Sequence, residues 1–180
     1  HRLGRPPHQY RTPQTPHASA ARAAPSASTT TTTSFQTPDG RKVPVAIGVT
    51  GINSRCISAN ILIAAPPSAV WDILTDYDNL SKYVPNLVAS RVKPHPTGGI
   101  RLYQEGAQKV VGFEFRAAVT MDMVESCGDA SEPKGLRRIN FSLVDSLMFG
   151  EFDGEWRLQP YSRKRVGEGY EYTSQLSYRV

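Results

Sequence analysis

The sequence lacks the motifs on which most enzymes, metalloproteins and membrane-spanning proteins depend. Its two cysteines, Cys56 and Cys127, have no metal-ligand spacing and are too few for a disulfide framework. No apolar run approaches the roughly 20 residues of a membrane-spanning helix, and no phosphate-binding loop, nucleophile elbow or zinc-protease motif occurs. We therefore predict no catalytic residue, no metal and no cofactor, which favours a binding protein over an enzyme.

Acidic residues are absent before Asp39, whereas four of the 21 basic residues lie in that stretch. After residue 34 the chain holds 17 basic and 16 acidic residues, so the formal net charge of +5 comes from the N-terminal segment. A charge excess in a tail is not a binding patch, and we therefore expect no nucleic-acid partner. The four basic residues of the tail are Arg2, Arg5, Arg11 and Arg22.

Segment 1–34 is rich in Pro, Ala, Ser and Thr and has almost no apolar periodicity, so we expect it to be disordered. Its arginines, its hydroxyl residues and its lack of acids are typical of organellar transit peptides. Its prolines would break the amphipathic helix of a mitochondrial peptide, which favours the chloroplast over the mitochondrion. An unstructured linker is the alternative. We predict that residues 35–180 form one domain with its own core.

The most informative stretch follows an apolar strand at 57–63, where Pro66 and Pro67 must end strand pairing. Apolar residues then recur at helical spacing, with Ser68 as the expected N-cap. A second short helix is expected within 78–87, capped by Asp78 or Asn79. The apolar positions of the first helix are Val70, Trp71 and Leu74, and those of the second are Leu80, Tyr83 and Val84.

After these helices the apolar period changes to two, which predicts antiparallel strands with one buried and one solvated face. We expect about seven strands that share one apolar face. Two short helices can cover only part of such a face. The chain ends at Val180 in mid-pattern, so we expect that a long C-terminal helix is missing and that the uncovered face promotes aggregation or dimerisation. The strand-like segments are 43–49, 55–63, 87–93, 99–106, 112–125, 136–143, 150–159 and 169–180.

Three segments resemble the START-like (helix-grip, SRPBCC) superfamily: A-P-P-S-A-V-W-D-I-L-T-D-Y-D-N-L at 65–80, Y-V-P-N-L at 83–87 and F-D-G-E-W-R-L-Q-P at 152–160. The resemblance is to the polyketide cyclase/dehydrase and coenzyme Q-binding branch, in its plastid and cyanobacterial versions. It implies an α+β fold in which a curved antiparallel sheet wraps around a long C-terminal helix and encloses an apolar cavity. Because that branch holds binders, assembly factors and few enzymes, the resemblance does not name the ligand.

The cavity candidates are the inward residues of the predicted strands, and the alternative for each is ordinary core packing. Tyr172 or Tyr178 could donate a hydrogen bond to a quinone or carbonyl oxygen. The candidates are Phe113, Phe115, Met121, Met123, Phe141, Trp156, Leu158, Tyr172 and Leu176.

Other polar or exposed features are interpreted structurally. His95 lies between two prolines in a predicted turn, so we expect a solvated loop histidine and not a general base. Asp76 and Asp78 are expected to cap helices and form turns, not to bind a metal. The loop 143–151 carries Leu147, Met148 and Phe149, which fit a cavity rim, a membrane-touching tip or a hairpin folded under the sheet.

Three functions are consistent with these features. The first is non-catalytic binding and transport of an isoprenoid, quinone, pigment or lipid in the chloroplast. The second is a cyclase or dehydratase, which needs an ionisable group inside the cavity. The third is an interaction or assembly factor with an organellar protein partner.

Overall fold

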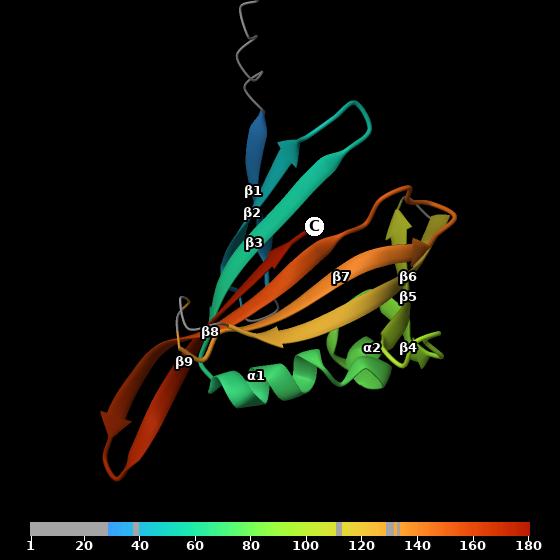
Figure 1. Ribbon diagram of the computed structural model, residues 1–180. Coiled ribbons are helices and arrows are strands. Elements are labelled where there is room, and N and C mark those ends of the chain that lie inside the picture. The colour runs from blue at the N-terminus through green and yellow to red at the C-terminus, as the bar shows by residue number, and fades with distance from the viewer. Residues whose placement is uncertain (1–28, 38–39, 111–112, 129–131, 133) are drawn as a thin grey trace, which may run out of the picture.

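A computed structural model describes residues 29–180 except 38–39, 111–112, 129–131 and 133. One antiparallel sheet of nine strands carries the fold, in the order β1-β2-β3-β9-β8-β7-β6-β5-β4 (Figure 1). Two short helices and a 3₁₀ turn connect β3 to β4. The strands are β1 Thr30–Gln36, β2 Lys42–Val49, β3 Arg55–Ile63, β4 Leu87–Lys93, β5 Ile100–Val110, β6 Phe113–Cys127, β7 Arg137–Asp145, β8 Gly154–Val166 and β9 Gly169–Arg179.

The curved antiparallel sheet with few short helices confirms the predicted α+β fold, although the sheet has nine strands and not about seven. Strand β1 is the addition. It begins within segment 1–34, so the structure differs from the expected disorder for Thr30–Ser34. Threonine is β-branched and suits a pleated strand even where no apolar residue alternates. The rest of that segment, 1–28, lies outside the described residues.

The helices are α1 Pro67–Leu74, the 3₁₀ turn η1 Tyr77–Asn79 and α2 Leu80–Tyr83. The predicted cap at Ser68 is wrong, because Pro66 is the N-cap and Pro67 is the first helical residue. Proline suits that position, where the missing N–H would have no intrahelical partner. The connection from β3 to α1 is anchored by Ser174 of β9, whose buried hydroxyl donates to the Ala65 carbonyl at 2.6 Å.

Asn79 is the N-cap residue of α2, as predicted, and Asp76 is that of η1, but neither element has a side-chain cap hydrogen bond. The Asp78 Oδ1 instead accepts from the Val92 N–H of β4 at 2.7 Å, and the Asp76 Oδ1 accepts from the Asn79 amide at 2.8 Å. The bond from Asp78 fixes η1 against the edge of the sheet.

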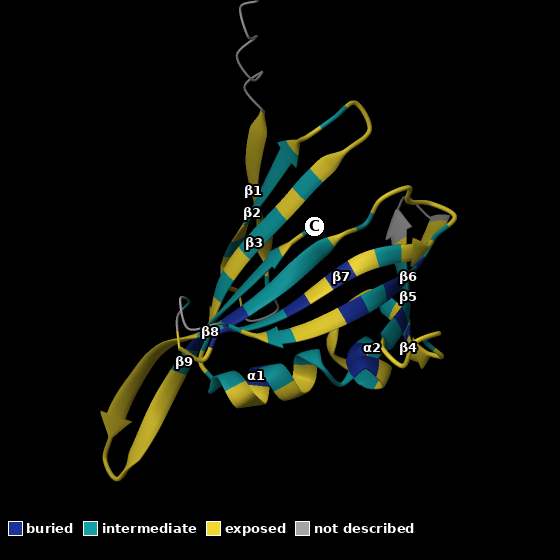
Figure 2. Ribbon diagram, in the orientation of Figure 1, coloured by how far each residue is buried: buried dark blue, intermediate teal, exposed yellow. Residues whose placement is uncertain are grey.

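The helices cover one face of the sheet, which we call the inner face (Figure 2). Its best buried residues are Leu102, Ile139 and Leu158, each with at most 1% of its surface exposed. Helix α1 contacts β8 and β9, while η1 and α2 contact β4. Among the described residues no helix lies over the inner face of β1 to β3, so the core occupies only one half of the sheet. Within that same part of the chain, no helix has the length and apolar character needed to cross a membrane.

His95 is not the solvated histidine that the sequence predicted. Its Nδ1 accepts from the backbone N–H groups of Thr97 at 3.1 Å and Gly99 at 3.0 Å. Its Nε2 therefore carries the proton and lies 3.3 Å from a carboxylate oxygen of Asp122. Arg101 binds the same carboxylate with two hydrogen bonds. Both ring nitrogens are engaged, so His95 locks the turn between β4 and β5 and has no free nitrogen for base catalysis.

We predict that His95→Ala lowers the free energy of unfolding by about 1–2 kcal/mol, because two backbone amides lose their acceptor while the Asp122 carboxylate keeps Arg101 as its partner. Urea unfolding followed by circular dichroism measures this. His95→Asn is the matched control, since its amide oxygen can still accept from the N–H groups of the turn. Its free energy of unfolding should lie between those of wild type and His95→Ala. Equal stability of all three proteins would contradict the role of His95 in stabilising the turn between β4 and β5.

Candidate functional site

An apolar cavity of about 170 Å³ lies between the helices and the inner face. Its outer wall comes from the end of α1, from η1 and from α2, and its floor from strands β4 to β9. The helical spacing and the strand alternation thus converge on one space. The lining residues are Leu74, Tyr77, Leu80, Val84, Leu87, Leu102, Gln104, Met121, Met123, Ile139, Phe141, Phe152, Trp156 and Tyr178.

Four of the nine predicted cavity residues line this space: Met121, Met123, Phe141 and Trp156. They come from three adjacent strands, β6, β7 and β8, whose register places them on the same face. Met123 is paired with Phe141 across β6 and β7. The period-two pattern therefore places these four side chains on the floor of this cavity.

The other predicted residues are not part of the lining. Leu158 is fully buried beside Arg137, whose guanidinium lies over the Trp71 ring, so it belongs to the core next to α1. Leu176 pairs with Leu158 and is half-buried. Phe115 is 61% exposed, in the part of β6 that extends beyond its pairing with β7. The side chain of Phe113 is not among those described.

Tyr172 lies on a projecting arm formed by the far ends of β8 and β9. Figure 2 shows this arm exposed along its length. The Arg163 guanidinium lies 3.6 Å from the Tyr170 ring centroid and 5.6 Å from that of Tyr172. The alternation that predicted Tyr172 thus continues into a region where no other layer covers it.

An aromatic cluster forms the wall of the cavity near β8. The Tyr178 ring lies 4.4 Å from the Trp156 ring and 5.9 Å from the Phe141 ring, measured between centroids. Phe152 is 5.8 Å from Phe141. Gly154 permits this arrangement, because a Cβ there would lie 2.6 Å from the Phe141 ring and 2.1 Å from a backbone oxygen of Arg179.

The loop between β7 and β8 continues the cluster to the surface. Phe149 packs on Phe152 with 5.3 Å between ring centroids, whereas Leu147 is fully exposed and Met148 is 63% exposed. Phe149 thus rests on Phe152 while it stays 38% exposed, and Leu147 and Met148 form an exposed apolar tip. Ser146 holds the loop to β6 through a 2.7 Å hydrogen bond to the Ala118 carbonyl.

Three polar side chains line the cavity without a charge. The Tyr77 hydroxyl donates to Glu125 at 2.8 Å, and burial together with that carboxylate raises the pKa of Tyr77 far above its usual range. Burial raises the pKa of Tyr178 to about 12. The Gln104 amide donates to Ser90, whose hydroxyl donates to the Tyr77 carbonyl. Both tyrosines stay protonated at neutral pH. The Tyr178 hydroxyl can donate to a ligand, whereas the Tyr77 hydroxyl already donates its one proton to Glu125.

Several lining residues are not among the predicted cavity candidates. Leu102 and Gln104 lie two residues apart in the predicted strand 99–106, so the period-two pattern could have identified both as inward residues. Tyr77 lies in the short connection between the helices, where no period identifies a face. Among the described residues, no group of His, Cys, Asp or Glu side chains has a metal-binding arrangement.

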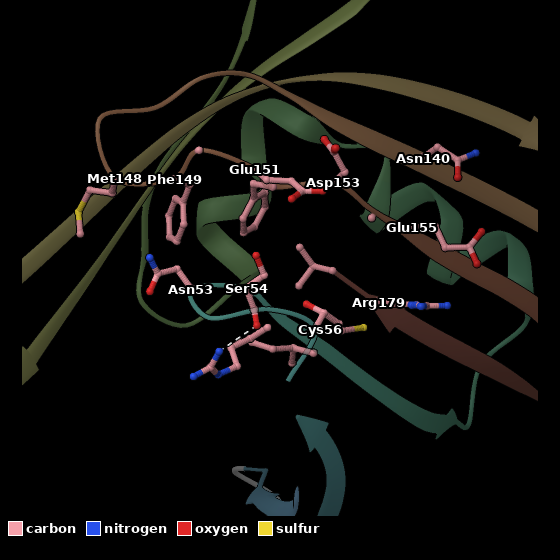
Figure 3. A pocket seen from close by; sticks show the side chains of 17 residues that line it. Asn53, Ser54, Cys56, Asn140, Met148, Phe149, Glu151, Asp153, Glu155 and Arg179 are labelled. Carbon is pink, nitrogen blue, oxygen red and sulfur yellow. Dashed lines mark hydrogen bonds between the residues drawn. The ribbon is translucent and has the colours of Figure 1, made fainter. Parts of the chain in front are cut away.

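A second, more open cleft of about 1020 Å³ lies between the β2–β3 hairpin and the β7–β8 loop (Figure 3). Charged residues line it, including Glu151, Asp153, Glu155 and Arg179. The Asp153 carboxylate already accepts from the Leu143 N–H at 2.8 Å. This cleft mixes charged with apolar side chains, whereas none of the described residues that line the smaller cavity is charged, so we take the smaller cavity as the candidate site for an apolar ligand.

The family model described as polyketide cyclase/dehydrase and lipid transport matches residues 63–180. No curated protein matches the sequence. The chain is similar in structure to the lipid transfer and protein localization domain of human StarD13, at 14% identity over 83% of this chain and 73% of that one, with a TM-score of 0.50. This likeness supports the fold alone.

Two further structures are similar at lower TM-scores. The STAR-related lipid transfer protein from Xanthomonas axonopodis shares 15% identity over 81% of this chain and 80% of its own, with a TM-score of 0.49. The Zhui aromatase/cyclase from a Streptomyces species shares 17% identity over 69% of this chain, with a TM-score of 0.44. The chain covers 66% of that aromatase/cyclase.

The raised pKa of Tyr178 predicts a loss of stability in alkali. Its folded-state value of about 12 lies above the ordinary value of 10.0, so its contribution is complete below pH 10 and is lost as the pH rises towards 12. About 2–3 kcal/mol of unfolding free energy should disappear over that interval. Tyr178→Phe should lose correspondingly less between the same pH values. Urea unfolding at a series of alkaline pH values measures the free energy of unfolding of both proteins. If it fell equally with pH in wild type and Tyr178→Phe, the raised pKa of Tyr178 would be contradicted.

Proposed function

Since the chain belongs to the polyketide cyclase/dehydrase and lipid transport family, we propose that it binds a hydrophobic small molecule in its apolar cavity and carries it without chemical change. The observation that supports this is the lining of the cavity, which combines Met, Leu and aromatic side chains with three uncharged polar groups. Such cavities bury most of an apolar ligand and orient it with a few polar contacts. Apolar burial contributes about 25 cal/mol per Å², so affinity should depend weakly on salt.

The volume of the cavity and the hydrogen-bond donors that line it indicate the class of ligand. A volume of about 170 Å³ is smaller than the 300–1,000 Å³ of typical ligand pockets, so the cavity fits one end of a larger molecule. The Tyr178 hydroxyl and the second N–H of the Gln104 amide suit a carbonyl oxygen at that end, whereas the one proton of the Tyr77 hydroxyl is already donated to Glu125. We propose an isoprenoid quinone, a related pigment or a lipid, with the chloroplast as its compartment. Met121 and Met123 are adaptable side chains that can follow an irregular ring system.

We predict that Val84→Trp abolishes ligand retention, because Val84 lines the cavity and a larger side chain would fill it. Val88→Trp is the matched control. Val88 is 48% exposed against 46% for Val84, lies four residues further along the chain and does not line the cavity. Native mass spectrometry followed by organic extraction, on protein purified from its own organism, measures the bound mass. Equal retention by both variants, or protein that arrives empty with a partner chain attached, would contradict the carrier function and favour an assembly factor.

A cyclase or dehydratase is the second candidate, and the pair Tyr77–Glu125 is the observation that favours it. The Tyr77 ring lines the cavity while Glu125 is exposed to solvent, so the hydroxyl lies between bulk water and the ligand space. To act as a general acid, the hydroxyl would turn from Glu125 to a substrate oxygen, deliver its proton there and recover one through Glu125, against the cost set by its raised pKa.

Tyr77→Phe distinguishes the two candidates, because it keeps the ring and removes only the hydroxyl. If the protein is an enzyme, turnover of a polyketide-like substrate should fall about 10²-fold or more while ligand binding persists. If it is a carrier, purified wild-type protein returns such a substrate unchanged. Glu125→Gln is the control, since it keeps a hydrogen-bond acceptor at the hydroxyl but removes the charge. Turnover by wild-type protein would contradict non-catalytic binding.

A further inference from the structure

Strand β1 forms one edge of the sheet and carries none of the features that normally block an edge. All seven of its residues are exposed, and T-T-T-T-S-F-Q contains no charge and no proline. Its pairing with β2 is regular from Thr30 to Gln36, without a bulge. Figure 1 shows β1 outermost in the sheet, beside β2. A straight, uncharged edge strand of β-branched residues is a template for another strand.

The opposite edge, β4, is protected in three ways. It carries Arg91 and Lys93, and its register with β5 shifts between Leu87 and Ala89. One of its backbone N–H groups, that of Val92, is already bound by the Asp78 carboxylate. Within the residues that the structure describes, the sheet thus has one edge protected by charge, a register shift and a side-chain acceptor, and one edge without these features.

The alternation of hydrogen bonds along β1 identifies the open groups. The Val49 N–H donates to the Thr29 carbonyl, so odd-numbered residues of β1 direct their backbone groups towards β2. The even-numbered residues therefore direct their N–H and C=O groups away from the sheet. They are Thr30, Thr32, Ser34 and Gln36.

We propose that β1 pairs antiparallel with β1 of a second copy of this chain, about a two-fold axis at Thr33. In this register Thr30 faces Gln36 of the partner subunit and Thr32 faces Ser34 of the partner subunit, so each outward group in the strand gains a backbone partner. The strand is self-complementary, because a two-fold axis makes an antiparallel pair from two identical edges. The two sheets join into one, with both inner faces, and hence both cavities, on the same side.

The composition of β1 selects a second copy over a foreign strand. It has no charge with which to recognise or reject a charged partner, and its one large residue finds a suitable neighbour in the symmetric register. Phe35 is 65% exposed and would lie opposite Thr31 of the partner subunit on the inner face. Aromatic and β-branched residues stabilise each other in such cross-strand pairs. β1 lies outside the stretch 63–180 that the family model matches, so the contact is a property of this chain.

The contact between the two β1 strands is small. One seven-residue strand buries less than the roughly 1,600 Å² of a standard stable interface, so we expect a dimer that dissociates at roughly micromolar concentration. Sedimentation equilibrium of the full chain across that range should therefore show a monomer–dimer equilibrium. A monomer throughout the range would overturn the proposal.

Thr32→Pro tests the edge directly. It removes an outward N–H and leaves the ladder with β2 intact, because the Thr32 N–H does not face β2. We expect the dissociation constant to rise at least about tenfold, while circular dichroism and the melting temperature show that the fold persists. Thr32→Val is the matched control, which keeps the N–H and should keep the dimer. A Thr32→Pro protein that dimerises like wild type would assign the contact to another surface, such as the uncovered inner face, and would overturn the proposal.

Cross-linking tests the register. Thr33 faces its symmetry mate in a non-hydrogen-bonded pair, with Cα atoms about 4.5 Å apart, which is within disulfide range. Thr33→Cys, in a chain whose Cys56 and Cys127 are replaced by Ser, should form a disulfide dimer on mild oxidation. Thr31→Cys should not, because its symmetry mate lies about four residues, or roughly 13 Å, along the strand. Equal cross-linking at both positions would overturn this register. Both tests are independent of whether the cavity holds a ligand.

Discussion

Strands β5 to β9 must keep a single register, because a shift by one residue would move every apolar side chain from the inner face to the solvent. The pairs Met123–Phe141 and Trp156–Tyr178 lock that register in the middle of the sheet. The helices pack on the surface that these pairs create, and the cavity is the space left between the two. Core, site and helix position are thus consequences of one alternation of side chains.

That alternation is also why the floor of the cavity could be predicted from the sequence. The pattern from 113 to 123 identifies Met121 and Met123 without any knowledge of the fold. It fails at Phe115 and Tyr172, because period two shows which face a residue shares but not how far the covering layer extends. The alternation does not identify β1 at all, because a run of threonines has β propensity but no alternating apolar residues.

Polar contacts were the least predictable part, since their partners lie far apart in the sequence. His95 and Asp122 meet only because β5 and β6 bring the turn and the strand together. The same holds for Tyr77 and Glu125, which are separated by 48 positions. A histidine between two prolines therefore resembles a loop residue until the register of the neighbouring strands is known.

The chemistry of the cavity favours binding over proton abstraction. Among the described residues that line it there is no carboxylate and no histidine, and its two tyrosines are held in their protonated form by burial. Such a lining can donate hydrogen bonds to a ligand oxygen, and the carboxylate that contacts it, Glu125, lies on the far side of the Tyr77 hydroxyl. The raised pKa of Tyr77 makes its hydroxyl a weak proton donor in catalysis, and a reaction that begins with removal of a proton from the substrate does not fit this arrangement. The carrier function needs only the donors and the apolar wall, and it is therefore the simpler account of the residues that are present.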